Sequence, residues 1–117
     1  MQEKIAYIYH NPRCSKSRAA LAILQDKNIP LQIIDYLLTP PTLKELQNIL
    51  LKLNLGAESL LRKNEEVFKD HYKDKMMSDE DILQTISSHP ILLERPLIIY
   101  GERAIIGRPP ERVLEIL

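Results

Sequence analysis

The chain has only one cysteine, Cys14, among its 117 residues, and this scarcity excludes an internal disulfide. A single thiol suits a reducing compartment, so we expect a cytoplasmic location. Cysteines and histidines at metal-ligand spacing are also lacking. We therefore expect neither a bound metal nor a bound cofactor.

Net charge is lacking as well, because 16 Lys and Arg residues balance 16 Asp and Glu residues. A neutral chain gives no reason for broad binding to nucleic acid or to membranes, so neither partner is expected. No apolar run reaches membrane-spanning length, and residues 1–4 lead directly into a predicted strand without a signal-peptide pattern. Internal repeats are also absent.

Apolar residues make up 44% of the chain and charged residues 27%, which is usual for a globular protein. A length of 117 residues suits one hydrophobic core, so we expect a single domain over residues 1–117, and a monomer. The hydrophobic pattern predicts an α/β fold in the order βαβ, a mainly helical insertion at about 42–88, and ββα.

The first part of the chain alternates between strand and helix signals. Residues 4–9 predict a buried strand, which His10-Asn11-Pro12 should end. Residues 14–27 have helical composition, and residues 31–36 predict a second strand. Two short strands joined by a helix indicate parallel pairing. The predicted apolar face of the helix consists of Ala20, Leu21, Ile23 and Leu24.

Capping patterns define the predicted insertion. Thr42, with Glu45 three residues later, forms a capping box that begins a helix, and we expect Gly56 to end it. Residues 57–75 are highly charged and irregular, which predicts short helical pieces. A second capping pattern begins another helix at Ser78.

The last part of the chain returns to strand signals. Residues 97–100 predict a strand, Gly101-Glu102-Arg103 a turn, and residues 104–107 the second arm of a hairpin. Pro109-Pro110 then opens a last helix, because proline is favoured in the first turn. The predicted inner stripe of that helix is Val113, Leu114 and Leu117.

The segment around Cys14 carries the chemistry. Cys14 lies between the first predicted strand and the first turn of a helix, where unpaired backbone N–H groups and the helix dipole favour an anion. The pKa of a thiol in that position can fall from about 8.5 into the range of roughly 3.5–7.5. Arg13, Lys16 and Arg18 add positive charge nearby. The segment thus offers a nucleophile and an anion-binding site together.

Alternative interpretations exist for three residues of this segment. A lone cysteine is often an inert buried residue. An apolar pocket does not explain the charged and polar neighbours of Cys14, so a reactive thiol is the preferred interpretation. Arg18 is open between a catalytic role and a cap on its own helix turn. His10 could tune the thiol or hold the loop, and we favour the structural role.

The positions around Cys14 follow the pattern His-Asn-Pro-x-Cys-x-x-Ser-Arg. Its members are His10, Asn11, Pro12, Cys14, Ser17 and Arg18. The pattern resembles that of the glutaredoxin-coupled arsenate reductases, a family of thioredoxin-fold thiol proteins, and the resemblance spans nearly the whole chain. The predicted element order also matches the thioredoxin fold. The chain differs from the familiar motif at Arg13, Ser15 and Lys16, where extra positive charge favours an anion.

Three arginines occupy positions that match basic sites of the family, namely Arg62, Arg95 and Arg108. The resemblance implies that they surround the cysteine and bind the oxyanion, a task that suits the planar two-pronged guanidinium. Each could instead be a solvated surface residue, Arg62 most of all, whereas Arg95 and Arg108 both precede a proline. Pro96 matches the cis proline that faces the redox cysteine in thioredoxin-fold proteins.

The resemblance also implies a reaction. The Cys14 thiolate attacks arsenate, glutathione attacks the arsenic as co-substrate, and a glutaredoxin resolves the adduct and releases arsenite. The single cysteine agrees with this scheme, because reducing equivalents must come from outside the chain. The resemblance gives supporting roles to His10, Asn11, Ser15, Ser17, Arg18 and Pro96.

Two other functions remain open. One is a glutathione-dependent thiol reductase of the same fold without arsenate activity, since such relatives often lack part of the arginine set. The other is an Spx-type regulator that binds RNA polymerase. Those regulators commonly carry Cys-x-x-Cys, whereas the position three residues after Cys14 is Ser17.

Overall fold

The computed structural model describes residues 4–117. The chain divides into two compact units, one built from the segments up to Thr39 and from Arg95 onward, the other from Pro40–Glu94. The expectation of one domain over the whole chain stays a prediction. Within residues 4–117, no helix combines the length and apolar character needed to cross a membrane.

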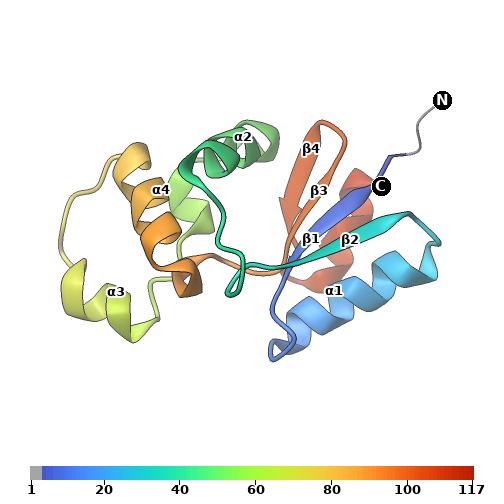
Figure 1. Ribbon diagram of the computed structural model, residues 1–117, viewed down its shortest axis with the longest axis horizontal. Coiled ribbons are helices and arrows are strands. Elements are labelled where there is room, and N and C mark those ends of the chain that lie inside the picture. Colours follow the sequence, from blue (N-terminus) through green and yellow to red (C-terminus); the bar gives the residue numbers. More distant parts are fainter. Residues whose placement is uncertain (1–3) are drawn as a thin grey trace. The chain divides into compact units, whose positions relative to one another are not determined.

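The first unit is a mixed four-stranded sheet with helices packed on it (Figure 1). Its elements are β1 (Ala6–His10), α1 (Ser15–Asp26), β2 (Leu31–Asp35), β3 (Leu97–Tyr100), β4 (Arg103–Ile106) and the 3-10 helix η3 (Pro110–Ile116). The strand order is β2-β1-β3-β4, with β1 and β2 parallel and the other pairs antiparallel. This arrangement confirms the predicted α/β order.

The core of this unit lies between the sheet and the helices α1 and η3. Side chains alternate along a strand, so Ala6 and Ile8 of β1 point to the same face of the sheet. There they pack against Ala20 and Leu24 of α1, and all four side chains are fully buried. The same cluster is completed by Ile98, Ile105, Val113 and Ile116.

Two boundaries in the first unit differ from the prediction. β1 begins at Ala6 and includes His10, which we expected to end the strand, because His10 continues the parallel ladder opposite Asp35. The hairpin turn is shorter than predicted, since Arg103 already pairs with Tyr100 across it. Gly101 takes a φ of 63°, a value that glycine adopts without strain, and this closes the turn in two residues.

The predicted inner stripe of the last helix is confirmed at Val113 and was wrong at Leu114 and Leu117. Its backbone is a 3-10 helix, in which residues three apart share a face. Val113 and Ile116 are therefore buried, whereas Leu114 and Leu117 are 46% and 38% exposed.

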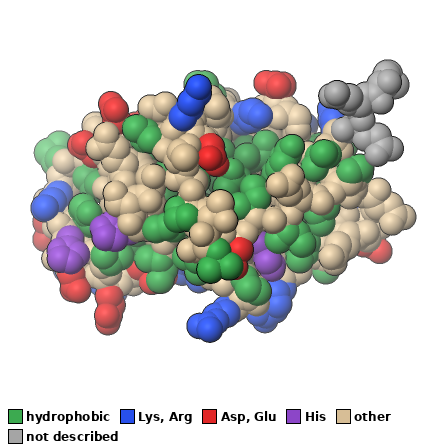
Figure 2. Space-filling model, in the orientation of Figure 1, with side chains coloured by type: hydrophobic (Ala, Val, Ile, Leu, Met, Phe, Trp, Pro, Cys, Tyr) green, Lys and Arg blue, Asp and Glu red, His purple; other side chains and the backbone are tan. Residues whose placement is uncertain are grey.

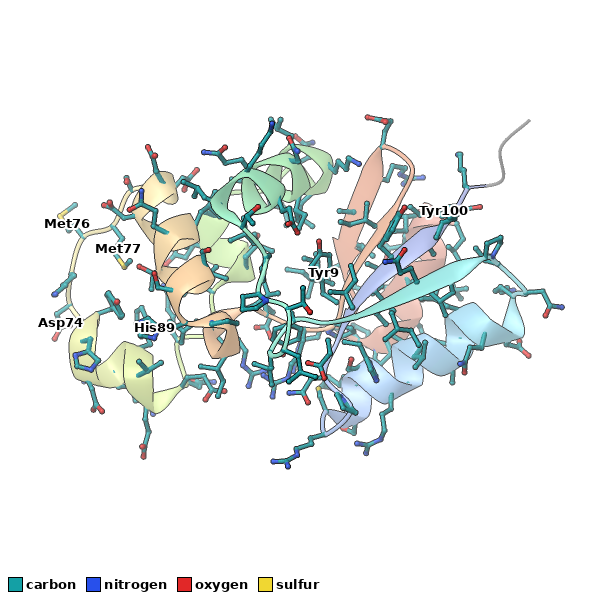
Figure 3. All side chains as sticks on the ribbon, viewed as in Figure 1. Tyr9, Asp74, Met76, Met77, His89 and Tyr100 are labelled. Carbon is teal, nitrogen blue, oxygen red and sulfur yellow. The ribbon has the colours of Figure 1, made fainter. Side chains whose placement is uncertain are left out.

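The second unit is helical. Its elements are α2 (Leu43–Leu53), the 3-10 helix η1 (Ala57–Leu60), α3 (Glu66–His71), α4 (Asp79–Ser88) and the 3-10 helix η2 (Pro90–Leu92). Between α3 and α4 the chain carries Asp74, Met76 and Met77, whereas His89 follows α4 and its ring lies edge-on to Tyr72 (Figure 3). The buried apolar side chains of α2, η1 and α4 are Leu46, Ile49, Leu53, Ala57, Leu60, Ile82, Leu83 and Ile86.

Both predicted N-caps of this unit are confirmed, although the reciprocal bond of a full capping box is present only at Ser78. The Thr42 hydroxyl oxygen accepts a hydrogen bond from the Glu45 backbone N–H over 3.1 Å, and Ser78 begins α4 with a complete capping box. The predicted end of α2 was wrong. Asn54, at φ 58°, ends the helix in the left-handed conformation that asparagine tolerates, and Gly56 instead precedes η1.

Candidate active site

Cys14 occupies the N-cap position of α1, directly before the first helical residue. Its backbone N–H donates to the Asn11 carbonyl over 3.0 Å, which closes the turn after β1. Its own carbonyl accepts from the Arg18 backbone N–H over 3.0 Å and so starts the helical hydrogen-bond ladder. The extended backbone of Cys14, at φ −93° and ψ 121°, is typical of an N-cap. The predicted position of the thiol at a helix start is confirmed.

The loop before Cys14 is held by its own polar groups. The Arg13 backbone N–H donates to the Asn11 side-chain oxygen over 3.0 Å. The Arg18 guanidinium donates to the Pro12 carbonyl over 2.8 Å. Asn11 and Arg18 thereby fix the path of the chain into the helix, which favours the structural interpretation of Arg18.

A buried pair of side chains lies beneath this loop. The His10 Nδ1 and the Ser17 hydroxyl are 2.6 Å apart, and the hydroxyl also accepts from the Asn11 backbone N–H over 3.1 Å. Burial lowers the pKa of His10, Asp35 opposes this by favouring the charged ring, and Arg18 lowers it further. Because the Ser17 hydroxyl oxygen accepts from Asn11, its hydrogen can be donated to Nδ1 of a neutral imidazole, the form that the lowered pKa of His10 favours. His10 and Ser17 thus tie the end of β1 to the first turn of α1.

Several groups act together on the Cys14 thiol. Burial by itself would raise the pKa of Cys14. The backbone N–H of Ser17, the hydrogen-bonding Arg95 guanidinium with its positive charge, and the N–H of Lys16 outweigh burial, so that the pKa of Cys14 is lowered. Ser17 and Lys16 lie in the first helical turn, where N–H groups have no partner within the helix. The helix start and one arginine therefore act on the same sulfur.

Arg95 lies two residues before the start of β3 and is the arginine whose side chain reaches Cys14. Burial alone would lower the pKa of Arg95, but hydrogen bonding and charge from Cys14 and Tyr36 raise it. Arg108 adds a contact from the other side of the hairpin, because its Nε donates to the Arg95 carbonyl over 2.7 Å. Arg95 is thus held through both its backbone and its side chain.

Pro96 and Gly107 pack closely beside this arginine pair. The Gly107 backbone N–H donates to the Pro96 carbonyl over 2.9 Å. A Cβ atom on Gly107 would lie 2.9 Å from the Pro96 ring, closer than real Cβ atoms come, so this position requires glycine. The Arg95–Pro96 peptide bond is cis, as the resemblance implies, and the Arg108–Pro109 bond is cis as well.

Positive charge also surrounds the site at the surface. Arg13 is exposed on the turn between β1 and α1, and Ser15, Lys16 and Arg18 are exposed on the first turn of α1 that follows it. Figure 2 shows Lys and Arg side chains gathered over this turn. An anion approaching Cys14 therefore meets a positive surface.

Arg62 belongs to the second unit, where two carboxylates engage it. Its Nε lies 3.3 Å from Glu65 and its Nη1 lies 3.5 Å from Glu94. The Arg62 backbone N–H also donates to the Leu92 carbonyl over 2.8 Å. Its predicted role toward the oxyanion stays a prediction.

Residues 9–116 match the ArsC family. The chain belongs to the ArsC family. It is 43% identical to an arsenate reductase of Neisseria meningitidis over 94% of this chain and 96% of that protein. It is 45% identical to an arsenate reductase of Haemophilus influenzae over 94% of this chain and 97% of that protein. The solved structure of an arsenate reductase from Vibrio cholerae matches with a TM-score of 0.92 at 41% identity, covering 99% and 100% of the two chains.

Family membership agrees with the predicted resemblance and with the thioredoxin-like α/β fold. Within the first unit, the structure brings together Cys14, Ser17, Arg95 and Arg108 through direct contacts or through the Arg95 backbone. Tyr36, which contacts Arg95, was not among the predicted site residues. Its position after a parallel strand was a usable signal, because functional side chains gather at the carboxyl ends of such strands.

The lowered pKa of Cys14 leads to a direct prediction. Alkylation requires the thiolate, so the rate at which Cys14 reacts with iodoacetamide should rise with pH and level off once the thiol is ionised. We expect the midpoint to lie below the value of about 8.5 found for a free thiol. Thiolate absorbance followed against pH measures the same midpoint independently. A midpoint at or above that free-thiol value would contradict the electrostatic account of the site.

Proposed function

We propose that this member of the ArsC family is an arsenate reductase in which the Cys14 thiolate attacks arsenate. The observation that carries this proposal is the contact between the Arg95 guanidinium and the Cys14 thiol at the start of α1. Arginine both favours the thiolate and offers donors to a tetrahedral oxyanion. The arsenate reductases that are 43% and 45% identical to this chain over almost its full length support the same substrate.

Arg95 and Arg108 bind the oxyanion in this proposal. Both precede prolines, at the two ends of the β3–β4 hairpin, and the hydrogen bond from Arg108 to the Arg95 carbonyl keeps the pair together. Guanidinium groups aimed at the oxyanion stabilise charge that moves onto oxygen during attack. Arg62 is the third member of the set by its correspondence to the family, and Glu65 and Glu94 orient its side chain.

The electrons come from outside the chain. Cys14 forms a bond to arsenic as a hydroxyl of arsenate leaves as water. Glutathione then attacks the arsenic, and a second oxygen leaves as water. A glutaredoxin thiolate attacks the glutathione sulfur, so that a mixed disulfide forms and the electron pair of the S–As bond reduces the arsenic. Water finally hydrolyses the Cys14–As bond, which frees the thiol and releases arsenite. Overall, two external thiols are oxidised to a disulfide, arsenate is reduced by two electrons, and arsenite and water are released. Such thiols are abundant in the cytoplasm, where we place the reaction.

The function is tested by reconstituting the reaction. We expect arsenate-dependent turnover only when both glutathione and glutaredoxin are supplied with the protein, because Cys14 is the single cysteine of the chain. Consumption of NADPH through glutathione reductase, together with direct measurement of arsenite, follows the reaction. Omitting either thiol component is the matched control and should reduce the rate to background.

Two outcomes would favour the other functions. Reduction of a mixed glutathione disulfide without any arsenate turnover would indicate a thiol reductase. Binding to RNA polymerase without turnover would indicate a regulator. The structure gives less support to the regulator, since Ser17, at the position of the second motif cysteine, is fully buried and bonded to His10.

A further inference from the structure

Tyr36 lies where β2 ends, beside the loop that carries Cys14. Asp35, the last residue of β2, pairs with His10, the last residue of β1, so Tyr36 follows at the same edge of the sheet. Its side chain is fully buried and its hydroxyl oxygen is shielded from solvent. Burying a hydroxyl is unfavourable unless it finds a polar partner.

The charged neighbour of this hydroxyl is Arg95, whose guanidinium interacts with the Tyr36 side chain. A guanidinium has only donors, so the tyrosine oxygen is the acceptor. The same guanidinium also forms a hydrogen bond to the Cys14 sulfur. One planar group therefore has contacts with two different side chains.

We propose that Tyr36 is a positioning residue, whose buried hydroxyl fixes the rotation of the Arg95 guanidinium so that it faces Cys14. Arg108 holds the Arg95 backbone, through the carbonyl oxygen. An arginine side chain has several rotatable bonds beyond its backbone, and a fixed backbone leaves these free. The rigid tyrosine ring constrains these bonds, because it is packed in the interior and has few rotamers of its own.

Replacing Tyr36 with phenylalanine tests this role. Tyr36→Phe keeps the ring but removes the acceptor, so Arg95 should face the sulfur for less of the time. We expect the pH midpoint of Cys14 ionisation to rise by about 0.5 to 1 on the pH scale. A change of this size corresponds to the loss of roughly one hydrogen bond. Thiolate absorbance against pH measures this change without any arsenate. An unchanged midpoint would overturn the proposal.

A double-mutant cycle shows whether the effect passes through Arg95. Tyr36→Phe should change the midpoint in the wild-type background and leave it unchanged in an Arg95→Gln background. A merely structural effect of the lost hydroxyl would be of the same size in both backgrounds, and that result would contradict the inference.

Tyr100→Phe is the matched control. Tyr100 also lies in the sheet of the first unit, but it pairs with Ala6, at the opposite end of β1 from His10. Figure 3 shows Tyr9 and Tyr100 toward opposite ends of this strand. Removing the Tyr100 hydroxyl should leave the Cys14 midpoint unchanged.

A measurement on the wild type covers the case in which Tyr36→Phe does not fold. The Arg95 guanidinium should give resolved, slowly exchanging N–H signals in a nitrogen-15 NMR spectrum, assigned by their absence from Arg95→Lys. Signals averaged by free rotation would contradict the proposal.

The kinetic part of this inference rests on the proposed function. Tyr36→Phe should lower kcat/KM for arsenate by about three- to tenfold, the effect of roughly one hydrogen bond. The two proposals fail in different ways. Absence of arsenate turnover in the wild type would remove the proposed reaction, while a shifted Cys14 midpoint would still support the positioning role. An unshifted midpoint in Tyr36→Phe, with normal arsenate turnover in the wild type, would remove the positioning role and leave the proposed reaction in place.

Discussion

Replacing Cys14 with serine is expected to abolish arsenate reduction. Cys14 is the only thiol of the chain, and a serine hydroxyl at this position is neither ionised at neutral pH nor able to exchange with glutathione. Loss of the nucleophile should lower kcat by at least about a thousandfold. Arsenite production by the purified variant, with glutathione and glutaredoxin in excess, is the measurement.

The fold should survive this replacement. Serine is a favoured N-cap residue, and its hydroxyl can accept hydrogen bonds from the first-turn N–H groups that now face the sulfur. The thermal midpoint of Cys14→Ser should therefore stay close to that of the wild type. Ala19→Ser is a suitable control, because it places serine at an exposed position of the same helix and should keep full activity. Turnover near the wild-type level in Cys14→Ser would end the assignment of the nucleophile.

Features that depend on neighbouring residues could be predicted from the sequence. The helix start at Cys14 and the caps at Thr42 and Ser78 were predicted because a cap is set by groups within a few residues. The parallel pairing of β1 and β2 followed in the same way from short apolar strands on either side of a helix.

Features decided by distant contacts could not be predicted in this way. His10 reads as a strand breaker locally, but its pairing with Asp35 keeps it in β1. The change to a 3-10 helix at Pro110 altered the period of the last stripe, which buried Ile116 in place of Leu117. The position of Tyr36 after a parallel strand could have marked it as a site residue. Its contact with Arg95 could not be predicted, because about sixty residues of chain separate the two.

The same difference between local sequence and long-range contacts applies to the three arginines. Local sequence indicated only that Arg95 and Arg108 adjoin prolines, and their roles came from the family resemblance. The structure adds that Arg95 contacts Cys14 and that Arg108 holds the Arg95 carbonyl. It gives Arg62 two carboxylate partners within its own unit, and its place in the oxyanion site remains a prediction.

Replacing Arg95 or Arg108 with lysine should reduce activity far more than a retained positive charge suggests. Lysine keeps the charge but loses the planar two-pronged contact with an oxyanion. A charge-assisted hydrogen bond contributes roughly 1.5–3 kcal/mol, so each replacement should lower kcat/KM for arsenate by about tenfold to a hundredfold. Arg103→Lys is the matched control, because Arg103 is exposed on β4, and its activity should not change.

The two variants should differ in their other properties. Arg95→Lys should raise the pKa of Cys14, because it removes the guanidinium that forms a hydrogen bond to the thiol. Arg108→Lys should leave that pKa nearly unchanged. It should lower the free energy of unfolding by only about 1 kcal/mol, through the lost hydrogen bond to the Arg95 carbonyl. Thiolate absorbance and thermal unfolding of each variant separate these effects from the loss of substrate binding.

Protection of Cys14 from alkylation completes the test of the oxyanion site. If Arg95 and Arg108 bind an oxyanion beside the thiol, arsenate and sulfate should each slow the reaction of wild-type Cys14 with iodoacetamide. Both lysine variants should need higher oxyanion concentrations for the same protection, by a factor similar to their loss in kcat/KM. A thiol reductase or a polymerase-binding regulator has no arsenate turnover to lose and no such protection. If arsenate neither turns over nor protects Cys14, the reductase proposal fails and one of those two functions takes its place.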